Sequence, residues 1–315
     1  MIHNDLISVI IPTYKRYDEL IRALNSVEKQ TYKNLEVLII DDNEDFELSQ
    51  KIEKLISENY ADYKYVKNNK NLGGAETRNK GVQLSNGKYI AFLDDDDEYY
   101  PSKIEEQYRM FIDNKDDKLA LIYCYGDIIY PNNAIEKERT NYRGNCLLEQ
   151  MKGNIAGTSF WLVKKEALVK VGCFKKIYSH QDGVVLLNLL AHGYKIDLVE
   201  KDLVKYYFHA KGKGITDVND FIVEANVQYL DLCKNYFNKI TKKEQKEVIL
   251  KYYDDRNWNL VILNRISDIK KDIKILFKKY FITKTIFICI FRLILKRYIY
   301  NKEKKFDKEV LLGEI

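Results

Sequence analysis

The chain has 315 residues, of which 46% are hydrophobic and 31% charged, a composition that excludes a disordered protein. The net charge of +5 is unevenly distributed: residues 1–210 have 29 basic and 33 acidic side chains, and residues 211–315 have 23 and 14. Five scattered cysteines without a CxxC pair favour reduced thiols over a disulfide framework, and the first residues lack signal-peptide organisation, so we expect a cytoplasmic protein.

Strand and helix patterns alternate along the first hundred residues. Short apolar runs predict strands over 6–11, 35–40, 63–66 and 88–93. Apolar residues at helical spacing predict helices over 17–29, 47–59 and 74–84. This order, with strands that are almost continuously apolar, predicts an α/β fold whose parallel sheet is covered by helices on both faces.

The pattern is more mixed after Pro101 and becomes helical near the end. We expect helices over 102–113, 164–171 and 182–192, strands over 119–125, 156–163 and 203–208, and a loop over 132–143. From residue 217 onward only helical patterns occur. Two glycines within 211–214 interrupt the chain, which predicts one domain over 1–213 and an all-helical C-terminal region over 214–315.

Four adjacent aspartates, Asp94–Asp97, directly follow the predicted strand 88–93. Adjacent carboxylates repel one another, so an ordered run of them needs a positive partner. The carboxyl end of a strand is where open α/β sheets bind ligands, and all-oxygen ligands suit Mg²⁺ or Mn²⁺. The alternative is a solvated acidic turn, but the apolar strand before the run and Pro101 after it favour a defined loop.

The sequence resembles family 2 glycosyltransferases, which have the GT-A fold. The resemblance covers residues 6 to about 210 and depends on four motifs in order, which lie at Ile7–Arg16, Val37–Asn43, Asn71–Gly81 and Phe92–Asp97. It implies a Rossmann-like, mostly parallel sheet and transfer of a sugar from a nucleotide donor, with UDP as the expected nucleotide.

The first two motifs imply a nucleotide site. By resemblance, Pro12, Thr13, Tyr14 and Arg16 line the pocket of the donor, and Asp42 binds the base. An aspartate at the carboxyl end of a strand can accept hydrogen bonds from a base. The alternative for Asp42, and for the aspartate before it, is a turn or helix-cap role.

The next two motifs imply a diphosphate and metal site. Arg78 follows two glycines at a helix N-terminus and is expected near the base or diphosphate, although it would otherwise be read as a surface cation. The resemblance makes Asp94 and Asp96 the ligands of Mn²⁺ or Mg²⁺, with Asp96 the principal ligand. It leaves Asp95 to contact the ribose and Asp97 to support its neighbours.

Asp182 is the expected general base. It aligns with the aspartate of the family's ED motif, which takes the proton of the acceptor hydroxyl in a single inverting displacement. The preceding glutamate of that motif is Gln181 here, which removes one negative charge beside the base. The alternative role for Asp182 is a helix N-cap, and both roles can coexist.

Four further residues are candidates for substrate contacts. His209 resembles a family histidine that completes the metal or diphosphate site, or it is an exposed residue at a strand end. Lys211 and Lys213 follow on a glycine-containing loop and could close over the diphosphate. Trp161 could stack on a sugar, although a buried tryptophan is the more common outcome.

The basic segment 277–300 combines large apolar residues with lysines and arginines, and its longest apolar run is too short to span a bilayer. We interpret it as an amphipathic helix on an anionic membrane surface, which would place the protein peripherally on the inner face of the cell membrane. The alternative is a helix packed on the catalytic domain or on a partner subunit, and a homo-oligomer is left open. Nucleic acid is not expected, because the aromatic residues follow core spacing.

The sequence therefore predicts a metal-dependent, inverting hexosyltransferase or N-acetylhexosaminyltransferase. Its partners would be a nucleotide-sugar donor and a glycan or lipid-linked acceptor. The alternative is a non-catalytic nucleotide-sugar-binding or interaction module with the same fold, which the intact acidic motif, Arg78 and Asp182 disfavour.

Overall fold

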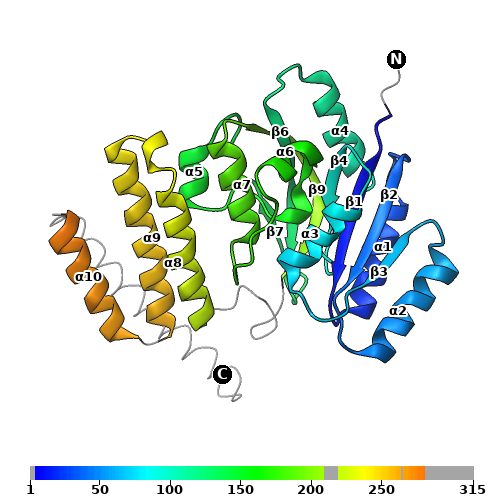
Figure 1. Cartoon of the computed structure of the whole chain (residues 1–315), viewed down its shortest axis with the longest axis horizontal. Coiled ribbons are helices and arrows are strands. Elements are labelled where there is room, and N and C mark those ends of the chain that lie inside the picture. Colours follow the sequence, from blue (N-terminus) through cyan, green and yellow to red (C-terminus); the bar gives the residue numbers. More distant parts are fainter. Residues whose placement is uncertain (1–3, 209–218, 264, 281–315) are drawn as a thin grey trace. The chain divides into compact units, whose positions relative to one another are not determined.

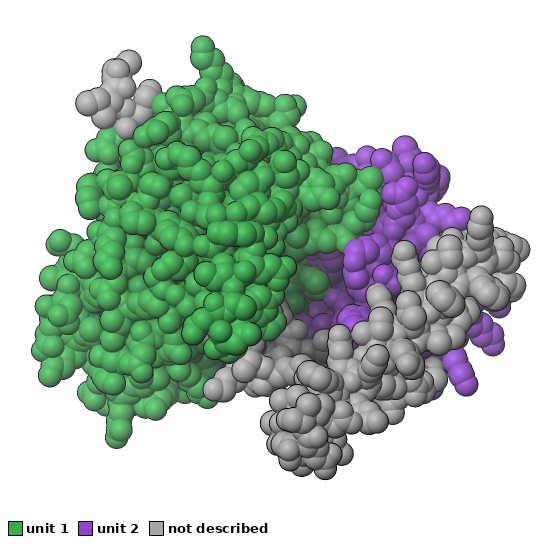
Figure 2. Space-filling view, turned by 180° about the vertical axis from the view of Figure 1, so that it is seen from behind, with its two compact units in different colours: residues 1–214 green, residues 215–315 purple. Residues whose placement is uncertain are grey.

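The computed structural model describes residues 4–208, 219–263 and 265–280. The chain forms two compact units, residues 1–214 and 215–315, which Figure 2 distinguishes by colour.

The first unit is an α/β structure. Its strands are β1 (Ile7–Thr13), β2 (Leu35–Asp41), β3 (Lys64–Lys67), β4 (Tyr89–Phe92), β5 (Glu98–Tyr99), β6 (Leu119–Ile129), β7 (Ile135–Glu138), β8 (Leu162–Lys164) and β9 (Lys195–Tyr207). Its helices are α1 (Tyr17–Glu28), α2 (Phe46–Asn59), α3 (Gly74–Leu84), α4 (Lys103–Asp113), α5 (Leu147–Lys152), the 3₁₀ turn η1 (Thr158–Phe160), α6 (Lys165–Lys170) and α7 (Gln181–Ala191).

These strands form one mixed sheet (Figure 1). Their order is β3-β2-β1-β4-β8-β6-β9-β5, with β7 paired to β6. The four strands β3, β2, β1 and β4 are parallel, as the sequence predicts. Beyond β4 the sheet is mixed, because β8 runs antiparallel to both of its neighbours while β6 and β9 are parallel. The predicted α/β class is confirmed.

The apolar strands are buried on both faces. Val9, Ile10 and Ile11 of β1 are completely buried, although successive side chains of a strand point to opposite faces. Helix α3 packs on β1 and β2. At Gly81 of α3 an added Cβ would lie 2.4 Å from Cγ2 of Ile10, so this close packing requires a glycine.

Several predicted boundaries are wrong in the second half of the sheet. Strand β7 lies within the predicted loop 132–143, and β9 begins at Lys195 rather than at residue 203. The predicted strand 156–163 is instead η1 followed by β8, and β5 and α5 were not predicted. Strand β7 (sequence IEKE) is mostly exposed at the sheet edge, so it has no apolar pattern from which to recognise it.

The second unit is helical in its described part, as predicted. It contains α8 (Asp220–Lys234), the 3₁₀ turn η2 (Phe237–Lys239), α9 (Lys242–Ile262) and α10 (Ile266–Tyr280). Leu276 of α10 packs against Leu250 and Tyr253 of α9. No helix in the described ranges is long and apolar enough to cross a bilayer. Most of the basic segment 277–300 lies outside the described residues.

Candidate active site

The carboxyl ends of three neighbouring parallel strands bring the sequence motifs together. β1 ends at Thr13, β2 at Asp41, and β4 leads into Asp94–Asp97. Since β1 pairs with β2 on one side and with β4 on the other, these segments lie along one edge of the sheet. Ligands of open α/β sheets bind at such an edge.

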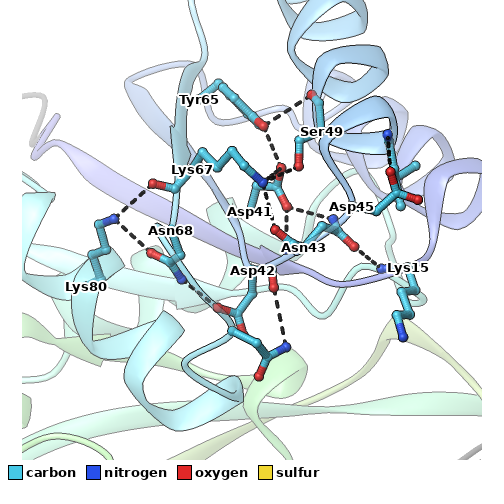
Figure 3. Close-up of polar contacts among 12 residues, drawn as sticks. Lys15, Asp41, Asp42, Asn43, Asp45, Ser49, Tyr65, Lys67, Asn68 and Lys80 are labelled. Carbon is cyan, nitrogen blue, oxygen red and sulfur yellow. Dashed lines mark hydrogen bonds and ion pairs between the residues drawn. The ribbon is translucent and has the colours of Figure 1, made fainter.

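Asp41 stabilises the turn after β2 (Figure 3). Its Oδ1 accepts hydrogen bonds from the backbone N–H and the side-chain amide of Asn43, at 2.8 and 2.6 Å. Its Oδ2 accepts a hydrogen bond from the Tyr65 hydroxyl of β3. Asp41 is therefore a structural residue of the turn.

Asp42 stabilises the loop that leads into α3. Its Oδ1 accepts hydrogen bonds from the Asn68 side chain and the Leu72 backbone, both at 2.8 Å, and its Oδ2 accepts one from the Gly73 backbone at 2.9 Å. A carboxylate can accept about four hydrogen bonds, so one position on Oδ2 remains for a ligand. Asp42 therefore has the turn role that was given as its alternative.

The turn between β1 and α1 is connected to both neighbouring motifs. Lys15 has a φ of 60°, and its N–H donates to Oδ1 of Asn43 at 2.6 Å (Figure 3). The N–H of Tyr14 donates to Oδ2 of Asp95 at 3.0 Å. The buried hydroxyl of Thr13 has no hydrogen-bond partner within the described part of the chain. The turn therefore has a fixed conformation and an unused polar group.

Two arginines form ion pairs with three of the four aspartates. Nη1 of Arg16 lies 3.0 Å from Oδ1 of Asp95 and 2.8 Å from Oδ2 of Asp96. Arg78 of α3 forms an ion pair with Asp94. These arginines are the positive partners that the acidic run was expected to need.

Asp97 is held by hydrogen bonds. Its carboxylate accepts them from the Ser159 hydroxyl at 2.6 Å and from the Tyr207 N–H at 3.2 Å. Burial raises its pKa well above the ordinary value, and burial likewise raises the pKa of Asp95 to about 6. Asp95, Asp96 and Asp97 are buried, so the solvated-turn alternative is wrong.

The acidic run supplies carboxylate oxygens, the type of donor that Mn²⁺ and Mg²⁺ prefer. No cluster of three or more His, Cys, Asp or Glu with metal-ligand geometry occurs among the described residues. Mg²⁺ in nucleotide sites commonly uses only one or two carboxylates and completes its shell with phosphate oxygens and water. Asp94 and Asp96 provide two carboxylates, and one oxygen of each is paired with an arginine.

Arg78 also connects the acidic run to the segment of the expected base. Its Nη1 lies 3.4 Å from Oε1 of Gln181, at the start of α7. At Gly74 an added Cβ would lie 3.0 Å from Nη1 of Arg78 and 3.4 Å from the Gln181 oxygen, so any side chain there would crowd this contact. The side chain of Arg78 is only 13% exposed, so Arg78 is a residue of the site rather than a surface cation.

Asp182 and Asp94 line the same cavity, whose volume is about 320 Å³. Burial raises the pKa of Asp182, against the opposing effects of the Gly183 N–H, His180 and Arg78. A carboxylate with a raised pKa is a better proton acceptor for a hydroxyl. The cavity is therefore lined by both a candidate base and a candidate donor-site carboxylate.

Of the four remaining candidates, Trp161 lies in the described part of the chain. Trp161 is completely buried and its Nε1 donates to the Ala156 carbonyl at 3.1 Å, so the expectation of a sugar-stacking role is wrong and the alternative core role is correct. His209, Lys211 and Lys213 lie outside the described residues.

The cavity also contains residues that the sequence analysis missed. Asn154 follows α5, Glu138 belongs to β7, and Tyr206 belongs to β9; all three line the cavity. Helix α5 and strand β7 were absent from the predicted pattern, and β9 was predicted to begin at residue 203 instead of Lys195. No motif singles out an isolated asparagine in a loop, so only the fold could identify Asn154.

The first unit is thus a mixed α/β sheet with an acidic run at its carboxyl edge and a cavity lined by Asp94 and Asp182, which agrees with the GT-A fold that the resemblance predicted. Residues 8–172 match the family described as glycosyl transferase family 2. The chain belongs to this family and is a glycosyltransferase.

Two relatives with glycosyltransferase names agree with this assignment. An uncharacterized glycosyltransferase of Methanocaldococcus jannaschii is 30% identical over 205 residues, covering 64% of this chain and 70% of that protein. The amylovoran biosynthesis glycosyltransferase AmsB of Erwinia amylovora is 27% identical over 245 residues, which cover 74% of this chain and 79% of that protein.

The same fold occurs in TarS of S. aureus. Its fragment 1–349, solved with UDP-GlcNAc, has a TM-score of 0.59 and 14% identity, covering 87% of this chain and 91% of the fragment. The match covers 43% of a longer TarS chain.

Proposed function

We propose that the protein is an inverting glycosyltransferase that moves a hexosyl or N-acetylhexosaminyl group from a UDP-sugar to a hydroxyl of a glycan or lipid-linked acceptor. The observation that carries this proposal is that Asp94 and Asp182 line one cavity of about 320 Å³. A single displacement needs the leaving diphosphate and the base on opposite sides of the reacting carbon, and this cavity offers a carboxylate for each.

The donor would lie along the carboxyl edge of the sheet. The nucleotide base of the donor would donate a hydrogen bond to Oδ2 of Asp42, near Pro12 and the unpartnered hydroxyl of Thr13. Asp94 and Asp96 would hold Mn²⁺ or Mg²⁺, which when bound neutralises charge on the leaving diphosphate.

On the acceptor side Asp182 would remove the hydroxyl proton. The guanidinium of Arg78 lies between the two halves of the site, since it pairs with Asp94 and contacts Gln181. In this position it adds positive charge next to the departing diphosphate and lowers the proton affinity of Asp182.

The relatives support a UDP donor and a polysaccharide product. The TarS fragment is solved both with UDP-GlcNAc and with UDP, and AmsB acts in amylovoran biosynthesis. We therefore infer a role in the synthesis of a bacterial-type surface polysaccharide.

A donor screen followed by a base substitution tests the proposal. Thermal shift with each sugar nucleotide and Mn²⁺ should raise the melting temperature with one UDP-sugar, because a ligand that binds only the folded state stabilises it. With that donor, Asp182→Asn should lose transfer by about 10²–10⁴-fold, whereas Asp117→Asn, in an exposed loop, should retain it. Full transfer by Asp182→Asn would overturn the base assignment, and donor binding without turnover by the wild type would favour the non-catalytic alternative.

We also propose that the basic segment 277–300 attaches the protein to anionic membrane. Liposome flotation should capture the full chain on vesicles containing phosphatidylserine but lose a chain that ends at Tyr280, which retains α10. Equal flotation of the two chains would exclude the segment as an anchor.

A further inference from the structure

The side chain of Asn154 holds the carboxylate of Asp182. Nδ2 of Asn154 donates to Oδ2 of Asp182 at 2.7 Å and to the Ala156 carbonyl at 3.2 Å. The other oxygen, Oδ1, accepts the N–H of Gly183 at 2.8 Å. Each carboxylate oxygen thus has one fixed donor and lone pairs left over for a substrate hydroxyl.

Asn154 is itself held by a buried glutamine. Gln150 of α5 is completely buried, and its Nε2 lies 3.2 Å from Oδ1 of Asn154 and 3.0 Å from the Gly183 carbonyl. Its Oε1 accepts the N–H of Ile155 at 3.1 Å. This network connects the segment after α5 to the first turn of α7, which fixes the orientation of the Asn154 amide.

We propose that Asn154 is a positioning residue for the general base: its amide fixes the rotation of the Asp182 carboxylate and favours the charged form that can accept a proton. The inference rests on the proposed function of Asp182. A donor hydrogen bond to a carboxylate stabilises its ionised state and restricts its geometry. No motif of the family resemblance includes Asn154.

Other charged and titratable groups surround Asp182. His180 precedes it on the chain, Arg78 faces it from α3, Asp94 from the segment after β4, and Tyr206 from β9. None of them changes in the variants below, so they act equally on the wild type and on each variant. A difference between these proteins therefore reports on the Asn154 amide.

A double-mutant cycle tests the contact without substrate. In the full chain, Asn154→Ala should lower the urea midpoint when Asp182 is present, and should lower it less in an Asp182→Ala background, where no carboxylate remains to be held. Asn145→Ala is the matched control, because the Asn145 amide donates to the Leu190 carbonyl at the other end of α7. Its effect should be the same in both backgrounds. Equal effects of Asn154→Ala in the two backgrounds would overturn the inference.

A pH profile tests the catalytic consequence. In Asn154→Ala, the acid limb of UDP release from UDP-N-acetylglucosamine with Mn²⁺ should move to higher pH, because Asp182 has lost a donor that stabilises its charged form. Asn154→Asp should shift it further, because it adds a like charge, and Asn145→Ala should not shift it. An unshifted limb in both Asn154 variants would overturn the positioning role. Equal UDP release by wild type and Asp182→Ala would instead refute the proposed base, whatever the stability cycle gives.

Discussion

Removal of Arg78 should destabilise the first unit measurably. Arg78, whose side chain is 13% exposed, pairs with Asp94, whose side chain is 28% exposed. Breaking a buried pair by removing one partner typically costs about 3–5 kcal/mol. Because Asp94 is partly solvated, we expect about 2 kcal/mol for Arg78→Met, which corresponds to a fall in melting temperature of roughly 4–8 °C for a unit of this size.

Differential scanning calorimetry of the full chain, following the transition of the first unit, would measure this shift. Arg109→Met is the matched control, since Arg109 forms an exposed pair with Glu105 one turn earlier on α4 and should shift the transition by less than about 2 °C. The double variant Arg78→Met/Asp94→Asn should recover at least half of the loss, because no uncompensated carboxylate remains. If Arg78→Met behaved like Arg109→Met, or if the double variant recovered nothing, the pairing argument would be wrong.

Three further changes have expected outcomes. Gly126→Ala places a Cβ 2.6 Å from the Val204 carbonyl and should cost about 1–3 kcal/mol in urea unfolding, whereas Gly153→Ala, with no atom within 4 Å, should be neutral. Burial lowers the pKa of Lys103 to about 7, so wild-type stability should gain relative to Lys103→Met as pH rises from 7 to 10, by up to about 1.4 kcal/mol per unit; parallel curves would contradict this. Burial would raise the pKa of Glu36, but hydrogen bonds from its neighbours hold this pKa at about 2. The free energy of unfolding should therefore fall between pH 4.5 and 2, and acid unfolding of Glu36→Gln should show a smaller fall.

The first half of the sheet could be predicted because its residues are locally consistent. The strands β1, β2 and β4 are apolar on both faces, and the helices between them have regular apolar spacing. The second half could not be predicted as well. Strand β7 is exposed, and the long strand β9 mixes charged and apolar residues. The pairing of β9 with β6 also includes register shifts, which interrupt the regular alternation of the strand.

The site divides in the same way. The acidic run, Arg78 and Asp182 belong to sequence motifs, so their proximity could be anticipated. The Arg16 pairing with Asp95 and Asp96, the burial of Trp161 and the Asn154 contact could not. These contacts join residues that are between 28 and 80 positions apart or depend on packing, which no local pattern encodes.

By itself the sequence determined the class of fold, the family and the order of the chemical groups, because apolar periodicity and short motifs are local properties. The tertiary structure decided which charges neutralise one another and which side chains reach the cavity. Both depend on how the carboxyl edge of the sheet meets the first turn of α7 and the loop after α5. That arrangement places Asn154 against Asp182 and Arg78 between the two halves of the site.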